Sequence, residues 1–276
     1  LPIFEKQSMK QLSAGEFHGK TNRTLSLNGK VITDTEYTQS RVDWHYHEQA
    51  YFTFILQGNV LEGNRKEIYH CTAGSLLFHH WQDPHYNTKP AGFTRGFHIE
   101  LDTKWFSAHD LNIESLTGSF TIPHPQVKLF MYDIVKESIN SAVDSERNID
   151  MLLTRIFDSL TKTKNAESSY KPQWVSKIKE ILTENTSDSL SLIQLAHSIH
   201  IHPVHLSREF HKYFGCNLGE YTRKKKVEKA ISMLMNRKKN LQDISYECGF
   251  ADQSHFIRNF KKEKGMSPLA FRKCLY

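Results

Sequence analysis

The spacing of apolar and polar residues divides the chain into a strand-rich front part and a helical back part. From residue 41 to about 101, short runs of aromatic and β-branched residues, such as YFTFIL at 51–56, are bounded by Gly, Asn and Pro. Such runs are typical of the short strands of a β-sandwich or a small barrel. A further strand-like piece, TLSLNGKVITD at 24–34, extends the pattern toward the N-terminus. We therefore expect a β domain at the front of the chain.

Apolar residues change to helical spacing after this region. One stripe recurs at i, i+3, i+4 and i+7, which predicts an amphipathic helix. The stripe comprises Ile149, Leu152, Leu153, Ile156, Phe157 and Leu160. It would either pack on its own β domain or form the contact between two copies of the chain, and the pattern leaves both interpretations open. The polar segment 161–173 that follows predicts a linker.

The back part of the chain, from Trp174 onward, contains one short pattern twice. Four residues return fifty positions later in the same order. They are His205, Arg208, Phe210 and Gly215 in the first copy, and His255, Arg258, Phe260 and Gly265 in the second. Each copy has a short apolar helix, a turn of a few residues and a second helix, predicted at 203–214 and 253–264. This order of elements predicts two helix-turn-helix motifs, at about 190–215 and 241–265.

The second helix of such a motif can lie in the major groove of double-stranded DNA. In the second copy, Phe256 and Phe260 are four residues apart and must face the core. The opposite side near the N-terminal end then presents Gln253, Ser254, Ile257 and Arg258. Arg suits guanine and Gln suits adenine in the major groove. Further along the helix, phosphates are within reach of Lys261, Lys262 and Lys264.

The second helix of the first copy carries fewer polar groups that can read bases. Leu206 and Phe210 face inward, which leaves Val204, Ser207 and Arg208 exposed. We therefore expect this helix to contribute less discrimination between DNA sequences.

The charge distribution favours the same half of the chain as the DNA-binding part. Residues 172–276 hold 18 Lys and Arg against 10 Asp and Glu, a net charge of +8, whereas the first 171 residues hold 18 against 20, a net of −2. A neutral front and a basic back indicate that only the back half meets a polyanion.

Composition limits the remaining classes of protein. A length of 276 residues suggests about two domains. The longest apolar run is about six residues, too short for a membrane helix, and no basic-then-apolar signal peptide opens the chain. The four Cys form no C-x-x-C pair, so we expect buried free thiols rather than a zinc knuckle or redox motif. We expect a cytoplasmic protein without a membrane partner.

Residues 174–273 resemble the DNA-binding domain of the AraC/XylS family of bacterial transcription regulators. The resemblance is carried by GFADQSHFIRNFKKEKGMSPLAFRK at 249–273 and by LSLIQLAHSIHIHPVHLSREFHKYFG at 190–215. It implies two helix-turn-helix subdomains joined by a long helix, here at 217–234, with two recognition helices in successive major grooves. The first turn departs from the family pattern, because His202 stands where a small cap is usual. The resemblance also implies a homodimer, a small-molecule effector and RNA polymerase as a partner.

The front part resembles the cupin pattern, which has H-x-H on one strand and a further His after a Pro turn. His45 and His47 share one face of a strand, and His85 follows Pro84. The carboxylate of the cupin metal pattern is missing, since Tyr51 and Phe52 stand at its positions. In AraC/XylS regulators such a domain is the usual effector-binding domain.

Three uses of these histidines remain open. One is a small-molecule pocket lined by His45, His47, Tyr51, Trp81 and His85. Another is a three-His metal site at His45, His47 and His85, which would suit Zn, Fe or Ni and leave an open coordination position. The last is a filled barrel whose histidines form only hydrogen bonds. We assign no cofactor at this stage and keep a metal ion as the alternative.

The sequence thus predicts an α+β protein with a cupin-like β-barrel and helices at 1–165 and an all-α AraC-type DNA-binding domain at 166–276. The expected function is that of a sequence-specific DNA-binding transcription regulator, without catalysis, modulated by a small molecule bound in the barrel. The alternative is a cupin-type metal-dependent enzyme fused to a DNA-binding domain.

Overall fold

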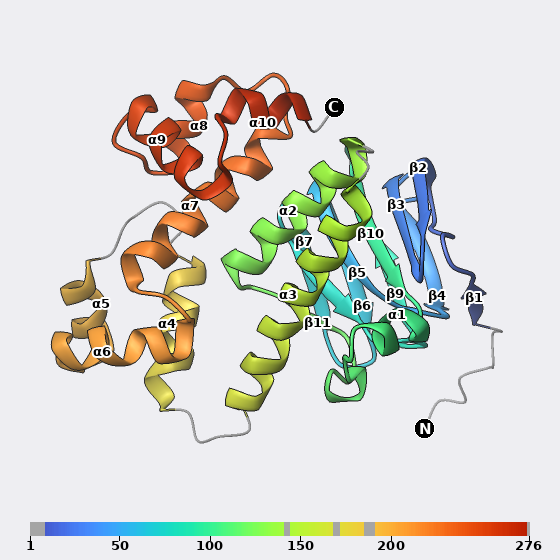
Figure 1. The fold of residues 1–276 in the computed structure, drawn as a ribbon, viewed down its shortest axis with the longest axis horizontal. Helices are drawn as coiled ribbons and strands as arrows, with labels where there is room; N and C mark the ends of the chain where they lie inside the picture. Colours follow the sequence, from blue (N-terminus) through green and yellow to red (C-terminus); the bar gives the residue numbers. More distant parts are fainter. Residues whose placement is uncertain (1–8, 141–143, 168–171, 185–190, 275–276) are drawn as a thin grey trace. The chain divides into compact units, whose positions relative to one another are not determined.

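The computed structural model describes residues 9–140, 144–167, 172–184 and 191–274 (Figure 1). The chain forms two compact units. A front unit contains Leu1–Ile122 with Ser141–Thr154, and a helical unit contains Pro123–Asn140 with Arg155–Tyr276. The division therefore crosses α3 (Ser145–Glu167), and the predicted boundary at 165/166 lies near the end of that helix.

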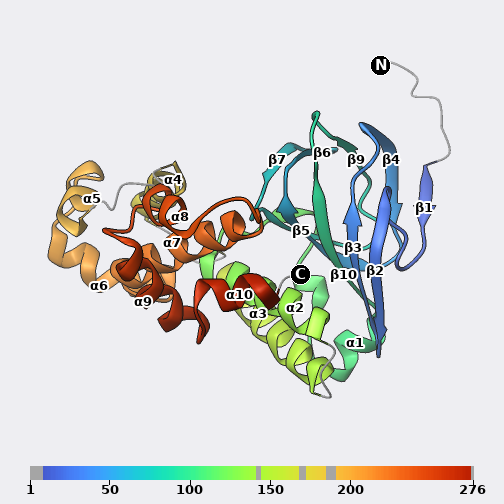
Figure 2. The same cartoon turned by 90° about the horizontal axis from the view of Figure 1, so that it is seen from above.

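The front unit is built from two β-sheets that lie face to face (Figures 1 and 2). One sheet has the strand order β1-β4-β9-β6-β7 and the other the order β11-β8-β5-β10-β3-β2. The strands are β1 (Lys10–Leu12), β2 (Lys20–Leu27), β3 (Lys30–Glu36), β4 (Arg41–His47), β5 (Ala50–Gln57), β6 (Asn59–Asn64), β7 (Ile68–Thr72), β8 (Leu76–His79), β9 (His85–Thr88), β10 (Arg95–Leu101) and β11 (Phe120–Thr121). In the described part of the chain the predicted cupin-like barrel is thus a pair of facing sheets and not a closed barrel.

The pattern of apolar residues along each strand depends on whether one or both faces of the strand are buried. β5 lies between β8 and β10, and every residue from Ala50 to Leu56 is buried, which explains its continuous apolar run. β4 alternates instead: Val42, His45 and His47 are buried between more exposed neighbours. This alternation directs the two histidines of the H-x-H pattern into the space between the sheets.

The helices of the front unit cover one edge of the sheets. The unit contains α1 (Thr103–Ala108), the 3₁₀ helix η1 (Ile113–Ser115) and the first part of α3. The buried ammonium of Lys30 lies 2.8 Å from a carboxylate oxygen of Asp150, and the same oxygen accepts a 2.7 Å hydrogen bond from the indole of Trp105. These bonds tie the start of α3 to the front unit.

The helical unit contains both predicted helix-turn-helix motifs. Its helices are α2 (Pro125–Asn140), the end of α3, α4 (Gln173–Glu184), α5 (Leu192–Ser198), α6 (Pro203–Phe214), α7 (Leu218–Leu234), α8 (Leu241–Glu247), α9 (Gln253–Lys264) and α10 (Pro268–Cys274). The pairs α5–α6 and α8–α9 are the two motifs, and α7 contacts helices of both pairs (Figure 1). The predicted bounds of both second helices and the long joining helix are confirmed.

The structure decides between the two interpretations of the α3 stripe and corrects one prediction about the linker after it. Its apolar stripe from Ile149 to Leu160 is buried within the single chain, so it is packed in the core and is not a free face for a second copy. The predicted linker at 161–173 is wrong over 161–167, because α3 continues to Glu167. Polar side chains such as Thr161, whose hydroxyl donates to the carbonyl of Phe157, continue the helix without an apolar stripe. Residues 168–171 lie outside the described residues.

The cysteines agree with the expected free thiols. Cys71, Cys216 and Cys248 are free and buried, and the side chain of Cys274 lies outside the described part. None of the described helices is long and apolar enough to cross a membrane.

Candidate functional site

The recognition helix α9 is fixed at both ends by local signals in the sequence. Asp252 caps its N-terminus by accepting a 2.6 Å hydrogen bond from the backbone N–H of His255. Gly265 ends the helix with a φ of 71°, a conformation that glycine adopts without steric cost. Phe256 and Phe260 are completely buried, as their spacing predicted. The rotation of α9 about its axis is therefore set by these two rings.

The opposite side of α9 is open to solvent. Gln253, Ser254, Arg258, Lys261 and Lys262 are exposed and Ile257 is half-buried. Within the described residues, no ion pair engages the cationic groups of Arg258, Lys261 and Lys262. Their charges therefore remain available to a polyanion.

The prediction that Lys264 reaches a phosphate is wrong. Its side chain is only 1% exposed, and its ammonium lies 2.6 Å from a carboxylate oxygen of Asp133 in α2. The ammonium also donates a 3.0 Å hydrogen bond to the carbonyl of Leu129. Lys264 therefore stabilises the packing of α9 against α2 inside the helical unit.

The recognition helix α6 has the same construction with a different N-cap. The ring of His202 accepts a 3.3 Å hydrogen bond from the backbone N–H of Val204, so this imidazole replaces the usual small cap. Leu206 and Phe210 are buried. Ser207, Arg208 and Val204 are exposed, Val204 by 51%. The exposed face of α6 is therefore less polar than that of α9.

Two lysines of α7 form hydrogen bonds within the helical unit. The ammonium of Lys226 donates to the carbonyl of Gly249, and that of Lys229 donates to the carbonyl of Glu247 at 2.7 Å. Both carbonyls belong to the end of α8 and the turn that precedes α9. These lysines therefore hold the second motif in place, which sequence position alone did not indicate.

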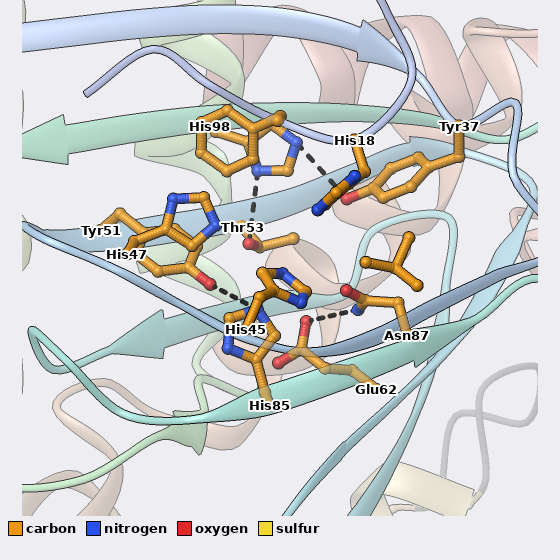
Figure 3. Close-up of a pocket in the computed structure, with 12 residues that line it drawn as sticks. His18, Tyr37, His45, His47, Tyr51, Thr53, Glu62, His85, Asn87 and His98 are labelled. Atoms are coloured by element: carbon orange, nitrogen blue, oxygen red, sulfur yellow. Dashed lines mark hydrogen bonds between the residues drawn. The ribbon is translucent and has the colours of Figure 1, made fainter. Parts of the chain in front are cut away.

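A cluster of histidines lies between the two sheets of the front unit (Figure 3). In one sheet His45 of β4 pairs in register with His85 of β9. In the other sheet Tyr51 of β5 pairs with His79 on one side and Glu100 on the other. The small cavity that they enclose, which we call the histidine pocket, is lined by Phe17, His18, Tyr37, Val42, His45, His47, Tyr51, Thr53, Glu62, His85, Asn87 and His98. The structure thus brings four of the five predicted effector residues together.

Trp81 is the predicted effector residue that the pocket does not include. It lies in the turn before β9, where its ring packs against His80 at 4.4 Å between centroids. His79 of β8 is buried behind Tyr51 and stacks on that ring at 4.2 Å between centroids.

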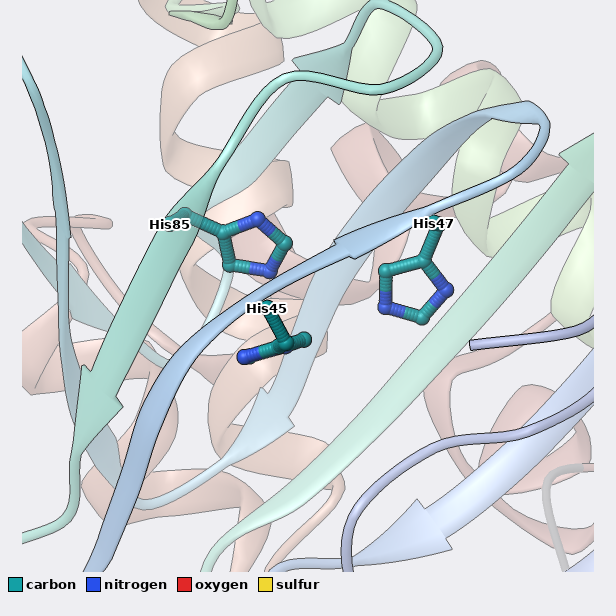
Figure 4. A group of neighbouring side chains, drawn as sticks. All are labelled: His45, His47 and His85. Carbon is teal, nitrogen blue, oxygen red and sulfur yellow. The ribbon is translucent and has the colours of Figure 1, made fainter. Parts of the chain in front are cut away.

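The imidazoles of the pocket are held in the neutral form. Burial, with the neighbouring imidazole of His85 as the next cause, lowers the pKa of His45 to about 2. Burial likewise lowers the pKa values of His47 and His85 to about 3. One ring nitrogen from each of these three residues lies within 4.8 Å of the other two, close enough that the three could hold a metal ion (Figure 4).

Two buried carboxyl groups beside the pocket were missed by the sequence analysis. Glu100 lies 3.3 Å from Nδ1 of His47, and burial raises its pKa to about 7. Glu62 accepts a 3.1 Å hydrogen bond from the amide of Asn87, and burial raises its pKa to about 8. Neither stands at the expected spacing from the H-x-H pattern. Positions 51 and 52 carry no carboxylate, as the sequence shows. The inference that no carboxyl group lies near the histidines is nevertheless wrong.

The fold defines a protein that joins a two-sheet β domain to a helical unit with two helix-turn-helix motifs. Residues 195–273 match the family model described as a helix-turn-helix domain. The chain is 36% identical over 100 residues to the bifunctional transcriptional activator/DNA repair enzyme AdaA of Bacillus subtilis. The aligned region covers 36% of this chain and 47% of AdaA. It is 40% identical over 68 residues to the probable transcription factor PqrA of Proteus vulgaris, covering 25% of this chain and 56% of PqrA.

A further relative matches nearly the whole chain. The HTH-type transcriptional activator RhaR of Enterobacter sp. (strain 638) is 20% identical over 271 residues, covering 92% of this chain and 95% of RhaR. Among solved structures, apo ToxT from Vibrio cholerae is similar at 12% identity and a TM-score of 0.42, covering 94% of this chain and all of that one. The chain spans about half the length of AdaA and PqrA. The domain match and the RhaR relative confirm the resemblance to the AraC/XylS regulators.

Proposed function

We propose that this protein is a transcription regulator that binds double-stranded DNA through α6 and α9. The observation that carries the proposal is the duplicated motif, in which each second helix turns its aromatic residues inward and its polar residues outward. The match of residues 195–273 to a helix-turn-helix domain supports it independently. The net charge of +8 over residues 172–276 supplies the attraction to phosphates.

The two helices have different roles in this proposal. Arg258 is exposed in the second turn of α9, and its fork fits the two acceptors of a guanine edge. Gln253, at the start of the helix, fits adenine, while Lys261 and Lys262 meet phosphates beyond the bases. On α6, Arg208 supplies the guanidinium, and the apolar side chain of Val204 suits a thymine methyl group.

We infer that the front unit receives the regulatory signal and that the chain performs no catalysis of its own. The relatives AdaA and RhaR are named as transcriptional activators, which supports activation of promoters together with RNA polymerase. A homodimer remains part of the proposal, but its contact must use a surface other than the buried stripe of α3.

The test is DNA selection followed by binding titration of single variants. A duplex selected from random sequence by the full chain is titrated with the wild type and with Arg258→Ala. We expect the variant to lose about 1–3 kcal/mol of binding free energy and to relax preference at one or two base pairs. Arg65→Ala, an exposed arginine of the front unit, is the matched control and should bind as the wild type does.

Two results would count against the proposal. If selection enriches no sequence and the wild-type affinity does not fall with salt, the helical unit does not bind DNA. A uniform loss of affinity in Arg258→Ala, with base preference unchanged, would make Arg258 a phosphate contact and would overturn its assignment to a base.

A further inference from the structure

Three ring nitrogens converge in the histidine pocket from two adjacent strands. His45 and His47 are alternate residues of β4, so both point to the same side, and His85 faces His45 across the β4–β9 pair (Figure 4). The rings of His45 and His85 are 4.2 Å apart between centroids. The three residues are buried on β4 and β9, so their positions are set by the sheet, although the register of this pair shifts between Val42 and His45.

The outer nitrogens of these rings are already occupied by acceptors. Nδ1 of His45 is 2.8 Å from the carbonyl oxygen of Asp43, and Nδ1 of His85 is 3.1 Å from that of Asp83. A carbonyl oxygen only accepts, so each neutral ring carries its hydrogen on Nδ1 and its lone pair on Nε2; on His85 this lone pair accepts from the hydroxyl of Tyr51. Nδ1 of His47 lies 3.3 Å from the carboxyl group of Glu100. Hydrogen bonds of this kind orient the histidine ligands of metal ions.

The size of the cavity decides which kind of ligand it admits. Its volume is about 20 Å³, which is enough for a water molecule or an ion. Other imidazoles of the front unit are engaged differently: both nitrogens of His98 face hydroxyl groups, those of Thr53 and Tyr37. The three converging histidines thus bring one ring nitrogen each to a space of ionic size.

We propose that His45, His47 and His85 bind a divalent transition-metal ion that prefers nitrogen ligands, such as Zn²⁺ or Ni²⁺, and that this ion is the regulatory ligand of the front unit. Tetrahedral Zn–N bonds of about 2.0–2.1 Å place ligand nitrogens about 3.3 Å apart. The three nitrogens, now within 4.8 Å of one another, therefore need to draw together by up to about 1.5 Å. The fourth position is left to water.

Tyr51 limits the affinity of this site. Its hydroxyl lies 3.0 Å from Nε2 of His85, and since the pKa of the phenol is raised by burial, the hydroxyl donates to the lone pair that the metal would use. Metal binding breaks this hydrogen bond. Tyr51→Phe removes the competing donor and keeps the ring that stacks on His79, so we expect metal to bind about 2–10-fold more tightly.

The metal site stands on its own geometry, whereas its regulatory role rests on the proposed function. The experiment therefore has two readouts on the full chain. After removal of metal by chelation, Zn²⁺ and Ni²⁺ binding is measured by equilibrium dialysis, and Co²⁺ binding by its visible absorption. DNA binding to a selected duplex is then titrated with and without the metal.

The key variant is His85→Asn, because the amide of Asn can keep the hydrogen bond to Asp83 while the ligand atom is lost. We expect one metal ion per chain in the wild type and at least a 100-fold weaker affinity in His85→Asn, with unchanged cooperative unfolding of the metal-free proteins. The exposed His70→Ala is the matched control and should bind metal as the wild type does. If His85→Asn fails to fold, Tyr51→Phe carries the test, and an unchanged or weaker affinity in that variant overturns the site.

Other outcomes separate the site from its role. Wild type without stoichiometric metal, or equal binding by wild type and His85→Asn, overturns the metal site whatever the DNA titration shows. Stoichiometric metal that leaves the affinity for DNA unchanged overturns the regulatory role and keeps the site. Loss of DNA binding in every protein, with metal still bound, contradicts the proposed function and not the metal site.

Discussion

Lys262 and Lys264 are two residues apart on α9, and we expect their replacement to affect different properties of the protein. Lys262 is exposed and makes no ion pair within the described residues, whereas the Lys264 side chain is 1% exposed and bonded to Asp133 and Leu129. We expect Lys262→Ala to weaken DNA binding without loss of stability. We expect Lys264→Met to destabilise the helical unit without changing how DNA binding responds to salt.

The exposure and partners of the two lysines set the expected changes in DNA affinity and in the free energy of unfolding. Loss of one phosphate contact lowers the slope of log affinity against log salt by about 0.9, so the defect of Lys262→Ala should shrink about 3.5-fold between 50 and 200 mM salt. Its stability should stay within about 0.5 kcal/mol of the wild type. Lys264→Met keeps the apolar stem and leaves Asp133, which is 27% exposed and can be hydrated, so its cost should be about 1–2 kcal/mol.

Removal of the partner should cost more than removal of Lys264. Asp133→Ala leaves a buried ammonium with only the Leu129 carbonyl to accept from it, and breaking such a pair costs about 3–5 kcal/mol. We expect about 3 kcal/mol here because the carboxylate was partly exposed. The double variant Lys264→Met with Asp133→Ala should be more stable than Asp133→Ala alone, since no charge then remains buried.

Urea unfolding followed by circular dichroism, and DNA titrations at several salt concentrations, measure both properties on the same proteins. A fall of about one in the salt slope for Lys264→Met, with unchanged stability, would show that Lys264 contacts phosphate and that its burial against α2 is wrong.

Three further predictions concern the fold. Leu153→Asp places a charge at a fully buried position of α3 and should abolish cooperative unfolding by calorimetry; a folded monomer would instead support the dimer interpretation of the stripe. Phe260→Ala should cost about 3–5 kcal/mol in urea unfolding, and a cost below 1 kcal/mol would contradict its place in the core. Gly265→Ala should cost about 1–2 kcal/mol because φ is +71°, although no atom lies within 4 Å of the added Cβ, while Gly219→Ala within α7 should be neutral or stabilising.

The DNA-binding motifs could be predicted almost residue by residue because their signals are local. Asp252, the pair Phe256 and Phe260, and Gly265 lie within fourteen positions and specify where α9 begins, which side is buried and where it ends. The failure at Lys264 has the opposite cause. Its partner Asp133 lies far away in the sequence, on a helix whose packing no local pattern reveals.

The histidine pocket could be predicted only as far as strand alternation reaches. Alternation placed His45 and His47 on one face, and that placement needed no knowledge of neighbouring strands. Which side chains stand opposite depends on register across pairs that are distant in sequence. Glu100 reaches the pocket because it pairs with Tyr51, and His98 because it pairs with Thr53. A shift of one residue in β10 would turn both away from the pocket.

This dependence on register also explains why the nature of the ligand could not be read from the H-x-H pattern. A search for a carboxylate at a fixed spacing after His47 finds Tyr51 and Phe52, and it suggests a site poor in acid. The structure supplies the acid from another sheet, where Glu100 faces Nδ1 of His47 rather than the space at the centre. A carboxyl group in that position orients a ligand instead of serving as one. In the metal site proposed above, Glu100 therefore orients the ring of His47, and the ligand atoms come from the three histidines on β4 and β9.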